Sequence, residues 1–205
     1  AGQNLANVNT PGYSRRTVLL SEVPPTDPMN AGRGVTVTGV EAQRDPFIDA
    51  RIHAETQSGA FDSAVLDGLT EIEAAVGLPG QSIDATLASF FDAFSTLASD
   101  PTSVTARDGV VVQGQQLALA VRTMNERFNS ARSDADTSLK SAVEEVNYLA
   151  SEVAKLNAAI VSGGTQVESL RDERNVAITK LSQLIGVNAT PTSDGTVDVT
   201  VGSGR

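Results

Sequence analysis

Apolar residues recur at steps of three and four along most of this chain, which is the spacing of helices that bury one face. The first long run follows Asp45-Pro46, an N-cap residue and a proline in the first helical turn, where a missing amide N–H costs nothing. Gly77 and Pro79 mark its end, so we predict a helix of about thirty residues and roughly 45 Å. Its stripe comprises Phe47, Arg51, Ala54, Ser58, Phe61, Val65, Leu69, Ile72 and Val76.

Two breaks divide the middle of the chain. Ser82 is a suitable N-cap for a second helix, and Asp100-Pro101 interrupts the pattern again. From there a helical pattern runs to Ser162, with glycines at 109 and 114 where the helix can bend. The apolar face of the second helix comprises Ile83, Leu87, Phe90, Phe91, Phe94 and Leu97.

The last part of this third helix carries the clearest heptad pattern of the chain. Alternating steps of four and three keep one seam of a helix against a partner. Asn157 falls in the seam, where a polar residue either specifies the register or lies at the solvent-facing edge of a short hairpin. The seam positions are Leu139, Val143, Val146, Ala150, Val153, Asn157 and Ile160.

A second helix follows the seam after a short turn. Gly163-Gly164 ends the long helix, and Thr165 with Glu168 forms a capping box that starts the next one, which stops at Gly186. Helices joined by so short a turn fold back on each other, so the sequence predicts an antiparallel helical hairpin. We expect Ala150 and Val153 in its interior.

Period-two alternation appears near both ends of the chain. Residues 35–40 alternate valine with small polar residues and predict a half-buried strand, while Val18–Leu20 can be extended. Residues 197–201 alternate after an Asp194-Gly195 turn and predict the second strand of a β-hairpin, whose first strand lies near 187–190.

These elements predict a mainly α fold: an elongated bundle of long helices with a coiled-coil helical hairpin, plus short β-strands at the N-terminal loop and the C-terminal end. We expect three parts, namely an N-terminal loop with an extended segment at 1–44, a helical domain at 45–186, and a β-hairpin at 187–205 that leads into an outer domain. Because the chain starts at Ala1 in the middle of a turn pattern, we interpret it as part of a longer protein.

Composition excludes several classes of function. The net charge of −10 disfavours nucleic acid and anionic lipid, which attract lysine and arginine. No apolar run approaches the roughly 20 residues that span a bilayer. Cysteine is absent and His53 is the only histidine, so no multi-histidine metal site, thiolate site or histidine-based triad can form within the chain. We predict no catalytic residue, cofactor or metal. Glu71, Glu73 and the charged run 171–174 could bind a cation or pair across helices, but solvated helix faces are far commoner and are our interpretation.

The opening residues carry the most specific signal. Residues 6–15 read Ala-Asn-Val-Asn-Thr-Pro-Gly-Tyr-Ser-Arg, a stretch rich in turn-forming residues. It resembles the loop shared by flagellar rod, hook and hook-associated proteins. The downstream order, from Arg44-Asp45-Pro46-Phe47 through Phe90-Phe91 and the hairpin to Leu184-Ile185-Gly186-Val187, resembles the hook-associated members. Rod and hook subunits pass soon into β-rich domains, and filament subunits lack the Thr-Pro-Gly-Tyr loop.

This resemblance implies a structural adaptor, without enzymatic activity, at the junction between flagellar hook and filament. It implies export through the flagellar type III secretion system to an extracellular flagellum. The implied partners are further copies in a helical assembly, the hook protein, a second hook–filament junction protein and an export chaperone, with no nucleic acid and no membrane insertion. Another axial protein of the distal rod or hook, and a secreted coiled-coil interaction protein, are the alternatives.

The resemblance also implies a role for the loop. In the family this segment joins inner, channel-lining helices to the outer domain and contacts neighbouring subunits; the alternative is that its residues only shape their own turn. The residues concerned are Asn4, Ala6, Asn7, Asn9, Thr10, Pro11, Gly12 and Tyr13.

Overall fold

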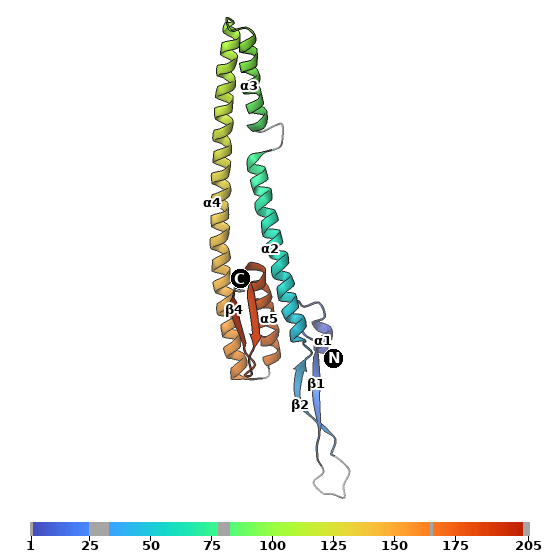
Figure 1. Cartoon of the computed structure of the whole chain (residues 1–205). Helices are drawn as coiled ribbons and strands as arrows, with labels where there is room; N and C mark the ends of the chain where they lie inside the picture. The colour runs from blue at the N-terminus through green and yellow to red at the C-terminus, as the bar shows by residue number, and fades with distance from the viewer. Residues whose placement is uncertain (1, 25–32, 78–82, 165, 203–205) are drawn as a thin grey trace. The chain divides into compact units, whose positions relative to one another are not determined.

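The structure is a computed structural model that describes residues 2–24, 33–77, 83–164 and 166–202. Contacts divide the chain into two compact units: unit 1 comprises residues 1–61 and 143–205, and unit 2 comprises residues 62–142. The elements, drawn in Figure 1, are α1 (Gly2–Ala6), β1 (Arg16–Glu22), β2 (Val35–Ala42), α2 (Pro46–Val76), α3 (Ile83–Ser99), α4 (Val104–Ser162), α5 (Val167–Leu184), β3 (Val187–Pro191) and β4 (Val197–Val201).

Local sequence signals set the helix ends. The Asp45 carboxylate accepts hydrogen bonds from the amides of Phe47 (2.9 Å) and Ile48 (3.4 Å), so it caps α2 as predicted. Gly77 ends α2 and Gly163 ends α4, each with a positive φ that favours glycine (88° and 77°). The helix α4 continues without interruption through both of its glycines. Pro79, Ser82 and Thr165 lie outside the described residues, and with them the predicted capping box.

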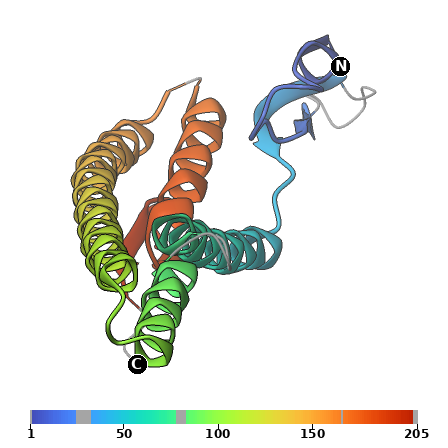
Figure 2. The same ribbon diagram turned by 90° about the horizontal axis from the view of Figure 1, so that it is seen from above.

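The core of unit 1 joins two helices and a hairpin. Leu149 and Val153 of α4 pack against Ala177, Ile178 and Leu181 of α5. Valines 187, 197 and 199 and Ala189 of the antiparallel pair β3–β4 cover this cluster. Figures 1 and 2 show the two strands lying against α5 and the end of α4. The predicted C-terminal β-hairpin is therefore confirmed, and it completes the core between the helices.

The seam of α4 differs from the predicted one. Leu149, Val153, Leu156 and Ile160 are buried, whereas Ala150 is exposed, so our placement of Ala150 in the interior is wrong. Leu139 and Val143 are exposed too. The buried residues are again three and four apart. Leu149 and Leu156, each one position before the predicted Ala150 and Asn157, face the partner helix.

The strands β1 and β2 form a separate antiparallel ribbon. Their register shifts between Leu19 and Leu20, which marks an irregularity of the bulge type. The strand prediction for residues 35–40 is confirmed, but Val35, Val37 and Val40 are 67%, 63% and 48% exposed. The expectation of a half-buried strand is therefore wrong for these three valines.

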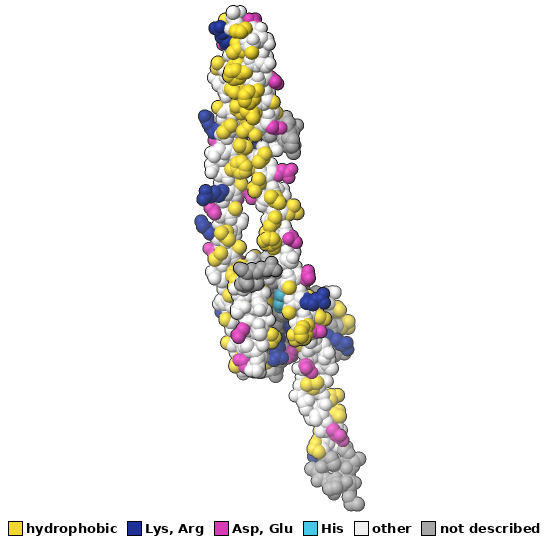
Figure 3. Space-filling view, in the orientation of Figure 1, with side chains coloured by type: hydrophobic (Ala, Val, Ile, Leu, Met, Phe, Trp, Pro, Cys, Tyr) yellow, Lys and Arg dark blue, Asp and Glu magenta, His cyan; other side chains and the backbone are white. Residues whose placement is uncertain are grey.

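The described part of unit 2 is helical apart from Gly77 and the turn at residues 100–103. In α3, the ring of Phe90 meets the rings of Phe91 and Phe94 edge to face, at centroid distances of 5.7 Å and 4.9 Å. A Cβ on Gly114 of α4 would lie 3.4 Å from the Phe90 ring, so α3 and α4 approach closely there. No residue of α3 is buried, and Figure 3 shows apolar side chains gathered along α3 and the neighbouring part of α4.

The predicted fold class is confirmed: long helices dominate, with short antiparallel strand pairs near both ends of the chain. The division into parts at 1–44, 45–186 and 187–205 remains a prediction.

Candidate functional site

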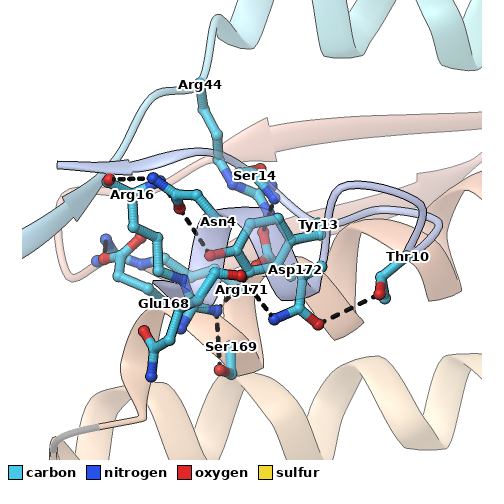
Figure 4. Close-up of polar contacts among 12 residues, drawn as sticks. Asn4, Thr10, Tyr13, Ser14, Arg16, Arg44, Glu168, Ser169, Arg171 and Asp172 are labelled. Carbon is cyan, nitrogen blue, oxygen red and sulfur yellow. Dashed lines mark hydrogen bonds and ion pairs between the residues drawn. The ribbon is translucent and has the colours of Figure 1, made fainter. Parts of the chain in front are cut away.

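Asn4, in the middle of the short helix α1, holds the opening loop together. Its Nδ2 donates to the carbonyl oxygen of Arg16 (2.9 Å), and its Oδ1 accepts from the Arg16 amide (3.0 Å) and from the Tyr13 hydroxyl (2.9 Å). Figure 4 shows these side chains converging from both sides of the loop. One amide side chain therefore closes residues 4–16 into a compact turn.

Asp172 of α5 binds this loop from across the unit. Its carboxylate accepts hydrogen bonds from the Ser14 amide (3.2 Å) and from Nη2 of Arg16 (3.1 Å), and it pairs with the guanidinium of Arg44. Arg16 also donates to the Ser169 hydroxyl at 2.8 Å. The Asp172 side chain is only 10% exposed, so these bonds replace most of its hydration. Two arginines from distant segments thus meet one buried carboxylate (Figure 4).

Gly12 lets the loop lie directly on α5. Its φ of +77° falls in the left-handed region, which favours glycine. A Cβ at this position would also overlap the Cγ2 methyl of Val176. Backbone conformation and close approach therefore both require glycine here.

The remaining loop residues divide into two groups. Asn7 and Thr10 bond locally, because the Thr10 hydroxyl donates to Asn7 Oδ1 at 3.2 Å and Asn7 Nδ2 donates to the Gln3 carbonyl at 3.0 Å. Ala6, Asn9 and Pro11 are exposed, as are two apolar neighbours, Leu5 (77%) and Val8 (70%). The loop thus has side chains that bind its own chain and others that stay exposed among the described residues, which we call its outer face.

The sequence analysis missed the residues that anchor the loop. Asp172 and Arg174 are buried, so the interpretation of the run 171–174 as a solvated face is wrong for these two positions. Arg16 and Arg44 lie far from α5 in sequence. The available signal was the mixture of opposite charges within 171–174, which does not identify partners in other segments.

His53 of α2 is more buried than expected for a surface helix residue, at 7% exposure. Burial lowers its pKa below the ordinary 6.5, and the negative charge of Asp49 opposes that shift. Its Nε2 has no hydrogen-bond partner within the part of the chain that the structure describes. Burial without a partner favours the neutral imidazole.

The described part of the chain contains neither a metal-binding cluster nor a membrane-spanning helix. Within residues 2–24, 33–77, 83–164 and 166–202, no group of three or more histidine, cysteine, aspartate or glutamate side chains is placed to hold a metal ion. None of the helices described is both long and apolar enough to cross a membrane.

Comparisons with known proteins point to one family. The model described as the flagellar hook-associated protein FlgK helical domain matches residues 69–205. Flagellar hook-associated protein 1 of Escherichia coli (strain K12) is 25% identical over 212 residues, covering 100% of this chain and 39% of that protein. The protein of the same name from Bacillus subtilis (strain 168) is 28% identical over 220 residues, covering 97% of this chain and 43% of that protein.

A solved structure is similar as well. The flagellar hook junction protein FlgK from Burkholderia pseudomallei matches with a TM-score of 0.68 and 25% identity, over 74% of this chain and 27% of that one. The chain spans about two fifths of the length of the curated relatives it matches (39% and 43%).

Proposed function

Because this chain belongs to the family of the flagellar hook-associated protein FlgK helical domain, we propose that it is a structural subunit of the bacterial flagellum, an adaptor at the hook–filament junction that filament assembly requires. The observation that carries the proposal is the match of the family model to residues 69–205, which include all of α3, α4 and α5. The subunit acts by binding other proteins and catalyses no reaction.

The surface of unit 2 supports an assembled state. Apolar side chains remain exposed on all of its helices, including Leu66 (63%) and Leu69 (58%) of α2, Phe91 (62%) of α3 and Val111 (59%) of α4. Exposed apolar surface of this extent along long helices is typical of contact surfaces. Helices that lie side by side in a tube wall bury such surface, and identical subunits in head-to-tail contact form open helical assemblies.

The proposed partners follow from this role. Copies of the chain pack against one another, the hook protein lies on one side, and a second junction protein lies toward the filament. A flagellar export chaperone holds the subunit before export by the flagellar type III secretion system, and the assembled subunit is extracellular.

The outer face of the opening loop is the proposed subunit contact. Ala6, Asn9 and Pro11 are exposed on it, beside Leu5 and Val8. The inner residues Asn4, Gly12 and Tyr13 act indirectly, because they fix the conformation in which the outer residues are presented, and Asn7 and Thr10 support the same turn.

Deletion of the gene in its source organism tests the proposal. We expect electron microscopy to show hooks without filaments and the culture medium to contain unpolymerised filament protein, with recovery when the gene is supplied in trans. Failure to build hooks would instead indicate a rod or hook subunit. Normal flagella on the deletion strain would refute the flagellar role.

A further inference from the structure

Unit 1 contains a cavity whose lining combines apolar side chains with arginine. The cavity has a volume of about 550 Å³ and lies among the start of α2, the middle of α5 and the β3–β4 turn. Pro46, Ile178 and Val197 contribute apolar surface, and Arg44, Arg171 and Arg174 contribute guanidinium groups. Asp49 contributes the carboxylate of the lining and pairs with Arg44 at 3.9 Å. This cavity is separate from the opening loop, apart from Arg44, which borders both.

Arg174 differs from the other arginines of the cavity in having no counter-ion among the described residues. Arg44 pairs with Asp172 and Asp49, and Arg171 pairs with Glu168 at 2.7 Å. Arg174 is only 8% exposed, yet no carboxylate among the residues that the structure describes lies within ion-pair distance of it. A buried charge without a partner is costly.

The bonds of Arg174 leave part of its guanidinium unused. Its Nη1 donates to Asn157 Oδ1 (2.8 Å) and to the carbonyl oxygen of Gly195 (2.9 Å). No hydrogen bond within the described chain involves its Nη2 or Nε, and the residue lines the cavity. Burial is the main cause that lowers the Arg174 pKa to about 10, and the positive charges of Arg171 and Arg44 lower it further. A negative charge that enters the cavity raises this pKa again. The lining therefore carries three guanidinium groups and the Asp49 carboxylate, and Arg174 retains donors that an anion in the cavity can use.

We propose that this cavity binds a carboxylate side chain of a second copy of the chain, with Arg174 as its counter-ion. The inference rests on the proposed function, which places copies next to one another. The chain has 25 aspartate and glutamate residues and a net charge of −10, so carboxylates are the charged groups that a neighbouring copy presents most often. A guanidinium and a carboxylate form strong, charge-assisted hydrogen bonds, and two can form side by side.

The rim of the cavity favours a protein as the source of the carboxylate. Phe47 lines the cavity and is 84% exposed, and the adjacent Ile48 is 55% exposed. A charged centre surrounded by exposed apolar side chains resembles the anatomy of a protein–protein contact, in which apolar groups exclude water from a buried ion pair. Contact between this cavity and a different face of the next copy is heterologous, which is the kind of contact that builds an open helical assembly.

Site-specific cross-linking in the source organism identifies the occupant. Phe47→p-benzoylphenylalanine, in the full-length protein, places a photoreactive group at the rim without altering Arg174. We expect irradiation of assembled flagella to give a cross-linked dimer of this chain, with mass spectrometry locating the attached peptide beside an exposed aspartate or glutamate. Cross-linking only to another protein, or no cross-linking in assembled flagella, overturns the inference.

A charge variant tests Arg174 itself. Arg174→Gln should lower the dimer yield at least tenfold. Lys155→Gln is the matched control, since it removes one positive charge from an exposed side chain of the same unit (70% exposed), and it should change the yield less than twofold. A thermal melt of each purified variant establishes folding. If Arg174→Gln does not fold, the test of the inference is the presence or absence of the cross-linked dimer in the protein with native Arg174. A normal dimer yield in folded Arg174→Gln overturns the inference but leaves the proposed function intact, whereas normal flagella after gene deletion contradict both.

Discussion

Replacing Gly12 by alanine tests the contact between the opening loop and α5, because glycine is required there for two separable reasons. The φ of +77° is strained for any residue with a Cβ, at a cost of roughly 1–2 kcal/mol. The new Cβ also overlaps the Cγ2 methyl of Val176, and overpacking of this kind costs about 1–3 kcal/mol. Together the two effects weaken docking of the loop by about 2–5 kcal/mol.

A second substitution separates the two costs. Val176→Ala removes the methyl group that the new Cβ meets, so it relieves the overlap and leaves the φ strain in place. Alone, Val176→Ala is mildly destabilising, because the side chain is partly exposed and loses only part of the ~0.8 kcal/mol that each buried methylene contributes. In the Gly12→Ala background it should be stabilising. We expect a coupling free energy of about 1–3 kcal/mol between the two sites, which is in the range of residues in direct contact.

Hydrogen exchange at the Ser14 amide measures this docking locally. This amide donates to Asp172 of α5, so it is protected only while the loop lies on α5, whereas the Arg16 amide donates to Asn4 within the loop and serves as an internal reference for the turn itself. Each 1.4 kcal/mol of docking free energy lost speeds exchange of the Ser14 amide about tenfold. Gly12→Ala should raise the Ser14 exchange rate at least tenfold, and adding Val176→Ala should recover part of the protection. If the effects of the two substitutions simply add, the contact does not exist and the reasoning fails.

Three further predictions concern stability, each measured by urea denaturation. Val153→Asp should lower the free energy of unfolding by about 3–5 kcal/mol, because it buries an unpaired charge in the core. Ala150→Asp, on the exposed side of the same helix, should lower it by less than about 1 kcal/mol. Equal effects of the two substitutions would contradict the placement of Val153 in the core. Asp45→Ala should cost about 1 kcal/mol through loss of the α2 cap, and Asp45→Ser should restore most of it. The lowered pKa of His53 means that the unfolded chain binds the proton more readily, so the free energy of unfolding should fall as pH decreases below 6.5. His53→Leu should lack this part of the pH dependence. The same slope of stability against pH in His53→Leu would contradict the prediction.

Elements set by local signals could be predicted from the sequence. The start of α2 at Pro46, the end of α4 before Gly163 and the β3–β4 hairpin around Gly195 all depend on residues within a few positions of the boundary. Such signals act through the conformation of single residues and their nearest neighbours.

The seam of α4 shows where a periodic pattern is insufficient. Both the predicted and the observed set include Val146, Val153 and Ile160. Between them, the predicted set has Ala150 and Asn157, whereas the observed set has Leu149 and Leu156, each one position earlier. Steps of three and four fit either set. The choice depends on the direction from which α5 and the β3–β4 hairpin pack, which is tertiary information. Asn157 illustrates this, since its partners come from two other elements: its side chain bonds both the amide (3.2 Å) and the carbonyl (2.9 Å) of Val197 in β4, and it accepts a hydrogen bond from Arg174 of α5 (2.8 Å).

The opening loop could be located from the sequence, but its anchorage could not, and that difference bears on assembly. The Ser14 amide and the Asp172 carboxylate are 158 residues apart, so the loop docks against α5 only after α5 has formed. Contacts of such long range form late in folding, because the entropy of closing the chain must be offset first. The outer face of the loop is therefore presented in its docked conformation only by a subunit whose unit 1 is complete. If copies are exported unfolded and add to a growing assembly, this dependence restricts the proposed loop contact to subunits that have already folded, and loss of Asp172 should impair assembly even though Asp172 itself faces the inside of its own chain.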